Sequence, residues 1–308
     1  MDRIRKLALA STATTFLLVG IGGLVRATKS GLGCGDNWPH CPGEVTRAMM
    51  IESSHRAVAG LLVILLGSLA VMAWRRRKEI PSLLRPCLAA FGLVLWQAML
   101  GAMVVWLHLE AESVVLHLAT AMALFALLIF ITAKTYALDD RRAPEDSSVS
   151  RSASVAATAV LALLLVGSYV TGRKAGYVFG DWPLMNGSLI PDLHIELYAI
   201  HFFHRALAAA VGIIVFVVGF GIIRRKDELP PQSTLAHIAV GAYAIELLVG
   251  AANVWTRLNA GVVTLHLALG ALIWGSLVGI AIVSKPLGAR VAEPSRRRSQ
   301  PALETTGS

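Results

Sequence analysis

The sequence has few charged side chains, which make up only 15% of its 308 residues, while hydrophobic residues make up 56%. This balance excludes an ordinary soluble globular chain. The sequence also lacks the Walker, Rossmann, HExxH and Gly-x-Ser-x-Gly patterns. It therefore gives no indication of a nucleotide-binding, zinc-protease or serine-hydrolase site of those kinds.

Long apolar runs account for this composition. A hydrocarbon core of about 30 Å needs roughly 20 mostly apolar residues per helix. Eight stretches meet this requirement and predict an all-α integral membrane protein with eight transmembrane helices, at about 7–27, 49–74, 83–106, 112–135, 153–172, 197–223, 233–256 and 261–284. The first stretch resembles a secretory signal, but it is longer than a typical one and has a counterpart at 153–172, so we expect it to be retained.

Basic residues are distributed unequally between the two sides of the predicted membrane. Of the 28 lysines and arginines, 20 fall in the segments on one side and six on the other. The side richer in basic residues is expected to be cytoplasmic, and it includes both termini. The net charge of +9 is therefore interpreted as an orientation signal and a contact to anionic membrane lipid, not to nucleic acid.

Two histidine pairs indicate an internal repeat. His55 and His117 are 62 residues apart, as are His204 and His266, and the second pair follows the first by 149 residues. Other residues match at the same offset, among them Arg56 with Arg205, Gly101 with Gly250, Trp106 with Trp255 and Leu116–Ala119 with Leu265–Ala268. The chain is therefore predicted to form two tandem four-helix bundles.

The repeat predicts four segments. Residues 1–138 form the N-terminal half, 139–152 a cytoplasmic linker, 153–285 the C-terminal half and 286–308 a disordered cytoplasmic tail. Each half has one long outer loop, at 28–48 and 173–196. The function is expected where these loops meet the ends of the helices.

The four histidines are expected at one depth, close to the outer boundary of the membrane. Intramembrane ionisable residues are costly and mostly functional. Two imidazoles in each half suit bis-histidine binding of a planar macrocycle between facing helices, which favours one haem position in each half. A zinc site would be expected to show tighter spacing or carboxylate partners. Buried structural histidines are the alternative.

Polar residues beside the histidines distinguish the two halves. Arg56 and Arg205 are interpreted either as snorkelling side chains or as partners of haem propionates. Glu52 lies three residues before His55, and His201 takes its place in the second half. Glu52 is interpreted as a proton acceptor or as a stabiliser of positive charge near haem. The alternative is an interfacial glutamate at a helix N-terminus.

Two cysteines and two buried polar residues complete the candidate set. Cys34 and Cys41 lie seven residues apart in the first outer loop, where a disulfide is expected, and the second long loop has no cysteine. Gln97 and Glu246 occupy matching positions inside the third and seventh predicted helices. Interhelical hydrogen bonding is the favoured role for both, with a proton path as the alternative.

Taken together, the motifs resemble those of the haem A synthase family over residues of about 10 to 284. The matching segments are Gly23–Arg26, Ser30–Cys34, Trp38–Cys41, Glu52–Arg56, Thr171–Gly172, Ala175–Gly176, Asp181–Gly187 and His204–Arg205. The chain departs from members with two cysteine pairs. That departure leaves open whether Cys34 and Cys41 have a redox role or brace the loop.

The resemblance implies an eight-helix membrane enzyme that oxidises a methyl group of haem O to a formyl group by successive hydroxylations. His204 and His266 would ligate a haem b cofactor, and His55 and His117 would flank the substrate, haem O, with Glu52 as the essential carboxylate. The implied partners are haem O synthase and the cytochrome oxidase assembly machinery.

Two other functions stay open on the residues alone. One is a membrane b-type cytochrome that relays electrons between equivalent haems, and the other is a non-catalytic haem carrier. The first span is not preceded by an Arg- and Ser-rich presequence, so a bacterial plasma membrane is the expected location. The electron acceptor and the oligomeric state stay open, and a homo-oligomer is one of the alternatives.

Overall fold

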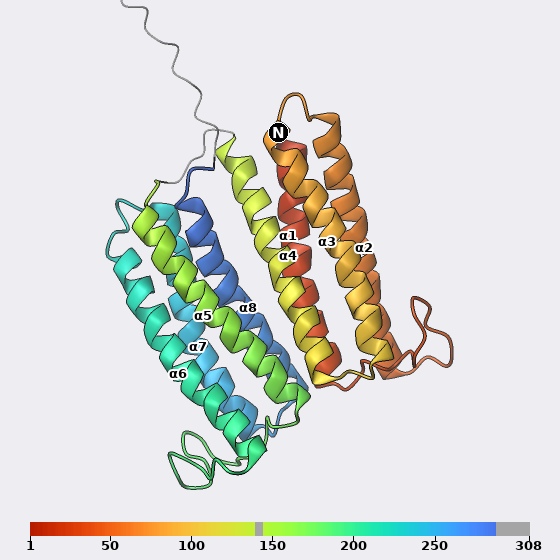
Figure 1. Ribbon diagram of the computed structural model, residues 1–308, viewed down its shortest axis with the longest axis vertical. Helices are drawn as coiled ribbons and strands as arrows, with labels where there is room; N and C mark the ends of the chain where they lie inside the picture. The colour runs from red at the N-terminus through yellow and green to blue at the C-terminus, as the bar shows by residue number, and fades with distance from the viewer. Residues whose placement is uncertain (139–143, 288–308) are drawn as a thin grey trace, which may run out of the picture.

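The computed structural model describes residues 1–138 and 144–287, and within these residues the chain is all helical apart from loops (Figure 1). The eight helices are α1 (Asp2–Ala27), α2 (Arg47–Arg75), α3 (Pro81–Trp106), α4 (Ala111–Ala137), α5 (Ser147–Gly172), α6 (Glu196–Ile223), α7 (Pro230–Trp255) and α8 (Ala260–Val283). The predicted all-α membrane fold with eight spanning helices is confirmed.

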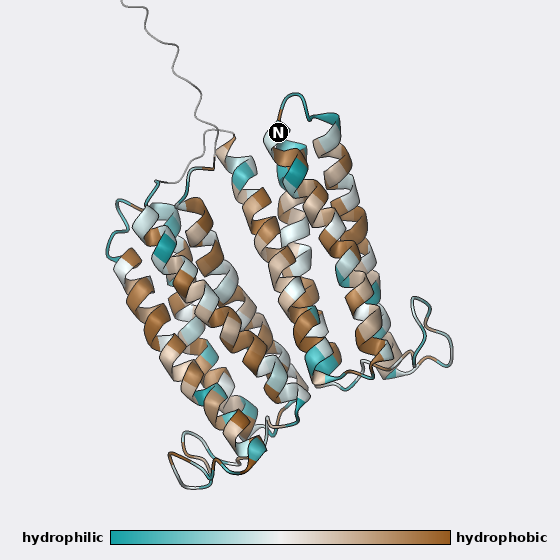
Figure 2. Cartoon of the chain, viewed as in Figure 1, coloured by the Kyte–Doolittle hydropathy of each residue, from teal (hydrophilic) through white to brown (hydrophobic). Residues whose placement is uncertain are grey.

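Each helix is long and apolar enough to cross a membrane. Hydrophobic residues dominate along the helices, whereas hydrophilic residues gather near their ends and in the loops (Figure 2). The helices contain 24 to 29 residues, more than the roughly 20 that a bilayer core requires.

The start of α5 differs from the predicted span, because it lies at Ser147 and not near residue 153. The Asp146 side chain caps the helix, since its Oδ1 accepts hydrogen bonds from the backbone N–H groups of Ser148 and Val149. Polar residues therefore form the first turn, which an apolar span does not reveal. The predicted disordered tail lies mostly outside the described residues.

The helices form two groups of four, α1–α4 (the N-terminal half) and α5–α8 (the C-terminal half), which lie side by side (Figure 1). Within each half every helix contacts its two neighbours in a closed ring. In the described residues α2 makes no contact with α4, and α6 makes none with α8, so these helices are diagonal partners. The halves meet along α1, α4, α5 and α8.

An aromatic pair marks the interface between the halves. Phe125 of α4 and Trp274 of α8, which are 149 residues apart in the sequence, have ring centroids 6.0 Å apart. Gly275 allows this approach, because a Cβ atom there would lie 2.8 Å from Cε1 of Phe125. Phe16 of α1 extends the contact, with its ring 6.1 Å from that of Phe125.

Close approach of α6 and α7 depends on Gly219. A Cβ atom at this position would lie 2.3 Å from Cγ2 of Val240. We therefore expect Gly219→Ala to destabilise the protein by about 1–3 kcal/mol through overpacking. Gly221→Ala is the matched control, because a Cβ atom there would meet no atom within 4 Å. Thermal unfolding in detergent should show a lower Tm for the first variant only, and equal Tm values for both would contradict the expectation.

Candidate functional site: two histidine pockets

The four histidines lie towards the same end of the two bundles, the end that carries both long loops. Each lies six to eight residues after the first residue of its helix, a distance of about 9–12 Å along the helix axis. We call this the loop end of the molecule. The predicted common depth of the histidines therefore agrees with the helix boundaries.

Each half contributes its two histidines from diagonal helices. His55 lies on α2 and His117 on α4, whereas His204 lies on α6 and His266 on α8. A group bound between the two imidazoles of one half would therefore lie across the bundle interior, with one imidazole on each side.

A glycine on the neighbouring helix gives each imidazole ring its space. A Cβ atom at Gly22 or Gly101 would lie 3.3 Å from Cε1 of His55 or His117, respectively. In the C-terminal half, a Cβ atom at Gly167 would lie 3.2 Å from Cε1 of His204, and one at Gly250 would lie 3.5 Å from Cε1 of His266. We call these four residues the seat glycines. Spacing alone indicated the match of Gly101 with Gly250, but not what either glycine contacts.

The Nδ1 atoms of the four imidazoles have different surroundings. Gln97 Nε2 lies 3.2 Å from Nδ1 of His117. Glu246 Oε1 lies 3.0 Å from Nδ1 of His266. The Nδ1 atoms of His55, His204 and His266 are buried and have no hydrogen-bond partner among the described residues. The approach of Glu246 to His266 is therefore a close contact without hydrogen-bond geometry. Gln97 therefore forms the predicted hydrogen bond between helices, from α3 to α4. For Glu246 this role stays a prediction.

These features fit a flat iron macrocycle better than an ion held by protein alone. Within the described residues, no three His, Cys, Asp or Glu side chains gather closely enough to hold a metal ion. Two imidazoles on diagonal helices leave the remaining ligands of an iron to a porphyrin. The seat glycines agree with such a group, because they leave room for the imidazole rings between the helices. Which histidines ligate iron stays a prediction.

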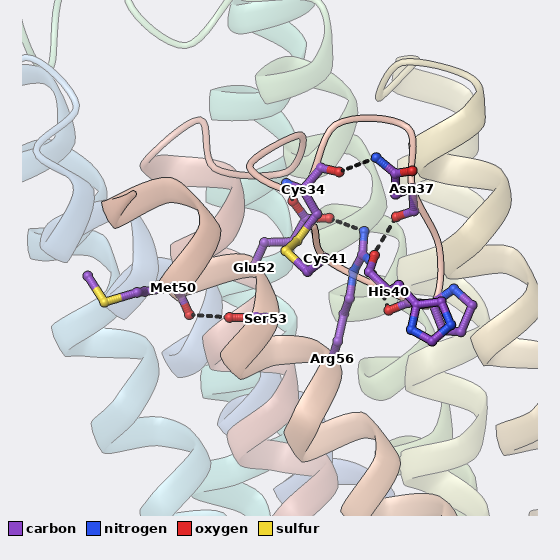
Figure 3. Close-up of polar contacts among 9 residues, drawn as sticks. Cys34, Asn37, His40, Cys41, Met50, Glu52, Ser53 and Arg56 are labelled. Atoms are coloured by element: carbon purple, nitrogen blue, oxygen red, sulfur yellow. Dashed lines mark hydrogen bonds and ion pairs between the residues drawn. A yellow bond between two sulfur atoms is a disulfide. The ribbon is translucent and has the colours of Figure 1, made fainter. Parts of the chain in front are cut away.

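Glu52 is buried, with 3% of its surface exposed. Its Oε2 accepts a 2.8 Å hydrogen bond from the backbone N–H of Cys34, and its Oε1 accepts a 2.5 Å bond from Arg56 (Figure 3). The carboxylate thus joins the first long loop to the helix that carries His55. Its predicted catalytic role stays a prediction.

The predicted disulfide is present between Cys34 and Cys41, whose Cα atoms are 4.7 Å apart (Figure 3). It closes a tight segment of the first long loop directly over Glu52 and Arg56. The remaining cysteine, Cys87, is buried in α3 and is not part of the site.

The guanidinium of Arg56 binds the same loop through backbone carbonyls. It donates to the carbonyl oxygens of Asn37, Pro39 and His40 at distances of 2.8–3.3 Å. Sequence reasoning proposed snorkelling or propionate pairing for this arginine and did not foresee a loop clamp. The propionate interpretation stays a prediction.

The C-terminal half repeats this clamp with different chemistry. Arg205 donates to the carbonyl oxygens of Asp181, Pro183 and Leu184, and its Nε donates to Nε2 of His201 at 2.9 Å. His201 is buried, and its Nδ1 lies 2.7 Å from the carbonyl oxygen of Ala175. An imidazole with both nitrogens engaged therefore stands where the first half has a carboxylate.

Fold and site define a class: an eight-helix membrane protein with two histidine pockets suited to haem. The model of the COX15-CtaA family, described as cytochrome oxidase assembly protein, matches residues 5–49 and 44–278. This match covers most of the chain, and the chain belongs to that family.

Three relatives agree with this assignment, and each carries the name haem A synthase. The protein from Symbiobacterium thermophilum is 30% identical over 94% of this chain and 97% of its own length. The proteins from Halalkalibacterium halodurans and Staphylococcus saprophyticus are both 28% identical, over 91% and 89% of this chain and 97% and 93% of their own lengths.

Enlarging a seat glycine should displace its imidazole. We expect Gly167→Val to push the His204 ring away and to weaken haem binding in the C-terminal half on the order of tenfold. Gly221→Val is the control, since it carries the same helix-propensity cost but meets no neighbouring atom. Haem retained per chain after purification, read from the optical spectrum, is the measurement. Equal haem content in both variants would show that the glycine does not position the ring.

A carboxylate holds the second long loop in shape. Asp181 accepts 2.8 Å hydrogen bonds from the backbone N–H groups of Gly187 and Asn186, which lower its pKa below the ordinary 3.8. Since the folded pKa is the lower one, this contribution is present above pH of about 3.8 and is lost as the pH falls through the folded value.

Asp181→Asn should therefore make residues 173–195 more susceptible to proteolysis at neutral pH, because an amide has a single acceptor oxygen for two N–H donors. The wild-type loop should become equally susceptible only in acid. Asp36→Asn in the first loop is the control and should leave cleavage of the second loop unchanged. A variant loop that stays resistant at neutral pH would refute the role.

Proposed function

We propose that this protein is a haem A synthase, an oxidoreductase that oxidises a methyl group of haem O to a formyl group for cytochrome oxidase biogenesis. The observation that carries the proposal is the inequality of the two pockets. Both have paired imidazoles, but only the N-terminal one has a buried carboxylate, Glu52, one helical turn before its histidine. The names of the relatives support the same activity.

The C-terminal pocket is proposed to hold a resident haem b. His204 and His266 would hold it, and haem b supplies one-electron redox chemistry when bound. The N-terminal pocket takes the substrate, haem O, between His55 and His117. Since α4 and α8 pack against each other at the interface, the two pockets lie on adjoining helices, which suits transfer of electrons from one pocket to the other.

Glu52 is proposed to assist the oxidation of the haem O methyl carbon. Conversion of a methyl group to an aldehyde with one water molecule as the oxygen source releases four electrons and four protons and passes through positively charged species. The electrons would leave through the C-terminal pocket to an external electron acceptor. A carboxylate held at a fixed place can accept a proton or stabilise such charge. Each Glu52 oxygen has one described partner and keeps a second lone-pair direction for this purpose.

The loop end is proposed to face the outside of a bacterial plasma membrane, with both termini in the cytoplasm. The excess of basic residues at the opposite end supports this orientation. The Cys34–Cys41 disulfide supports it as well, because such bonds persist on the oxidising side of the membrane. Haem O synthase is the expected supplier of the substrate.

Replacing Glu52 tests the activity. Glu52→Gln keeps an acceptor for the Cys34 N–H but cannot take up a proton, so haem A formation should fall at least a hundredfold. Haem b in the C-terminal pocket should stay bound with an unchanged optical spectrum. Glu112→Gln, an exposed glutamate in the first turn of α4, is the matched control and should retain full activity.

The measurement is reverse-phase chromatography of haem extracted from cells that supply haem O and express each variant. Haem A should form with the wild-type chain and the Glu112 variant, and not with the Glu52 variant. Undiminished haem A with Glu52→Gln would refute the role of the carboxylate. Absence of haem A with the wild-type chain would favour an electron-relaying cytochrome or a haem carrier.

A further inference from the structure

Gln97 and Glu246 make the two pockets unequal at a second point. They are 149 residues apart, lie inside α3 and α7, and each contacts the Nδ1 atom of a pocket histidine. The amide is beside His117, and the carboxylate is beside His266. The two side chains have nearly the same shape, but an amide nitrogen can only donate a hydrogen bond and a carboxylate can only accept one.

The hydrogen bonds around Gln97 fix the direction of its amide. Its Nε2 donates to the backbone carbonyl of His117 at 2.8 Å, and its Oε1 accepts from Thr120 Oγ1 at 2.5 Å. The opposite orientation would place two acceptor oxygens, Gln97 Oε1 and the His117 carbonyl, 2.8 Å apart. The nitrogen of the amide therefore faces Nδ1 of His117 at 3.2 Å.

The C-terminal half has no equivalent lock. Leu269 stands 149 residues after Thr120, so no hydroxyl reaches Glu246 from that position. One oxygen of Glu246 lies 3.0 Å from His266 Nδ1, and its other oxygen, Oε2, is buried with no hydrogen-bond partner in the described part of the chain. His266 Nδ1 is therefore the polar atom that the Glu246 carboxylate approaches most closely among its described contacts.

These contacts select opposite tautomers for the two histidines. A neutral imidazole has one N–H and one lone pair. Beside the Gln97 amide, Nδ1 of His117 has to accept, which leaves the proton on Nε2. The Glu246 carboxylate oxygen lies 3.0 Å from Nδ1 of His266, although without hydrogen-bond geometry, and this closeness favours a proton on Nδ1 because two acceptors at that distance would repel each other. A proton on Nδ1 leaves a lone pair on Nε2. An iron ligand needs that lone pair, and ligating histidines usually donate their other N–H to a carboxylate or carbonyl group.

We propose that Gln97 and Glu246 are positioning residues that assign different roles to the two histidines: His266 ligates iron, whereas His117 presents an Nε2–H donor to the substrate macrocycle. This assignment rests on the proposed function and departs from the expectation that all four histidines are iron ligands. A resident cofactor has to stay bound, whereas a product has to leave. A pocket without the second strong iron–imidazole bond releases its occupant more readily.

Exchanging the two side chains tests the assignment. The purified full-length protein is supplied with haem O, and low-spin bis-histidine centres per chain are counted by electron paramagnetic resonance and optical spectroscopy. The wild type should show one such centre, in the C-terminal half. Gln97→Glu combined with Thr120→Leu copies Glu246 and Leu269, and it should add a second low-spin centre. Glu246→Gln should weaken haem binding in the C-terminal half about tenfold.

Two controls keep the test independent of folding and of turnover. The centre in the C-terminal half reports folding of the Gln97/Thr120 double variant, because neither substitution touches that half. Haem A formation is measured separately. If the low-spin centres have the expected counts but no haem A forms, the proposed function is overturned and the tautomer assignment is upheld. His117→Ala should leave the wild-type count of low-spin centres unchanged.

Two outcomes would overturn the assignment. The first is a second low-spin centre in the wild type with haem O that disappears in His117→Ala, since that would make His117 an iron ligand. The second is a folded Gln97/Thr120 double variant that gains no low-spin centre, since the carboxylate would then not control ligation.

Discussion

The need to keep imidazole groups inside apolar helices constrains the whole structure. Each ring requires space at a helix–helix contact, and that space comes from a glycine on the preceding helix, as Gly22 provides for His55 and Gly167 for His204. Each half is a closed ring of helices with its histidines on diagonal members. The two histidines of each half therefore lie on helices that face each other across the interior of the bundle.

The loops and the pockets are coupled by the residue that follows the first histidine of each half. Arg56 and Arg205 each bind three carbonyl oxygens of a long loop, so the loop conformation is transmitted to the helix that carries the histidine. The third participant differs, since the arginine is paired with Glu52 in one half and with His201 in the other. One loop clamp therefore includes a carboxylate with a further lone pair, and the other includes an imidazole whose two nitrogens are already used.

Sequence reasoning predicted the eight helices and the disulfide, because length, apolarity and cysteine spacing are local properties. It also placed the histidines at one depth, since helical rise converts position into depth. It did not predict that Arg56 and Arg205 bind the loops, because every residue has a backbone carbonyl and the identity of the acceptor residue therefore gives no signal in the sequence. The direction of the Gln97 amide was equally inaccessible, since it depends on Thr120 and on a carbonyl of the same helix.

The two halves differ in which of their histidines has a carboxylate beside it. The N-terminal pocket has a carboxylate beside the first histidine and a donating amide beside the second, whereas the C-terminal pocket has the carboxylate beside the second. A carboxylate behind a ligating imidazole strengthens an iron–nitrogen bond, and a carboxylate beside the macrocycle can take up protons instead. Under the proposed function, the carboxylate near His266 would help to retain a resident haem, and the carboxylate near His55 would serve a substrate haem that is altered and released.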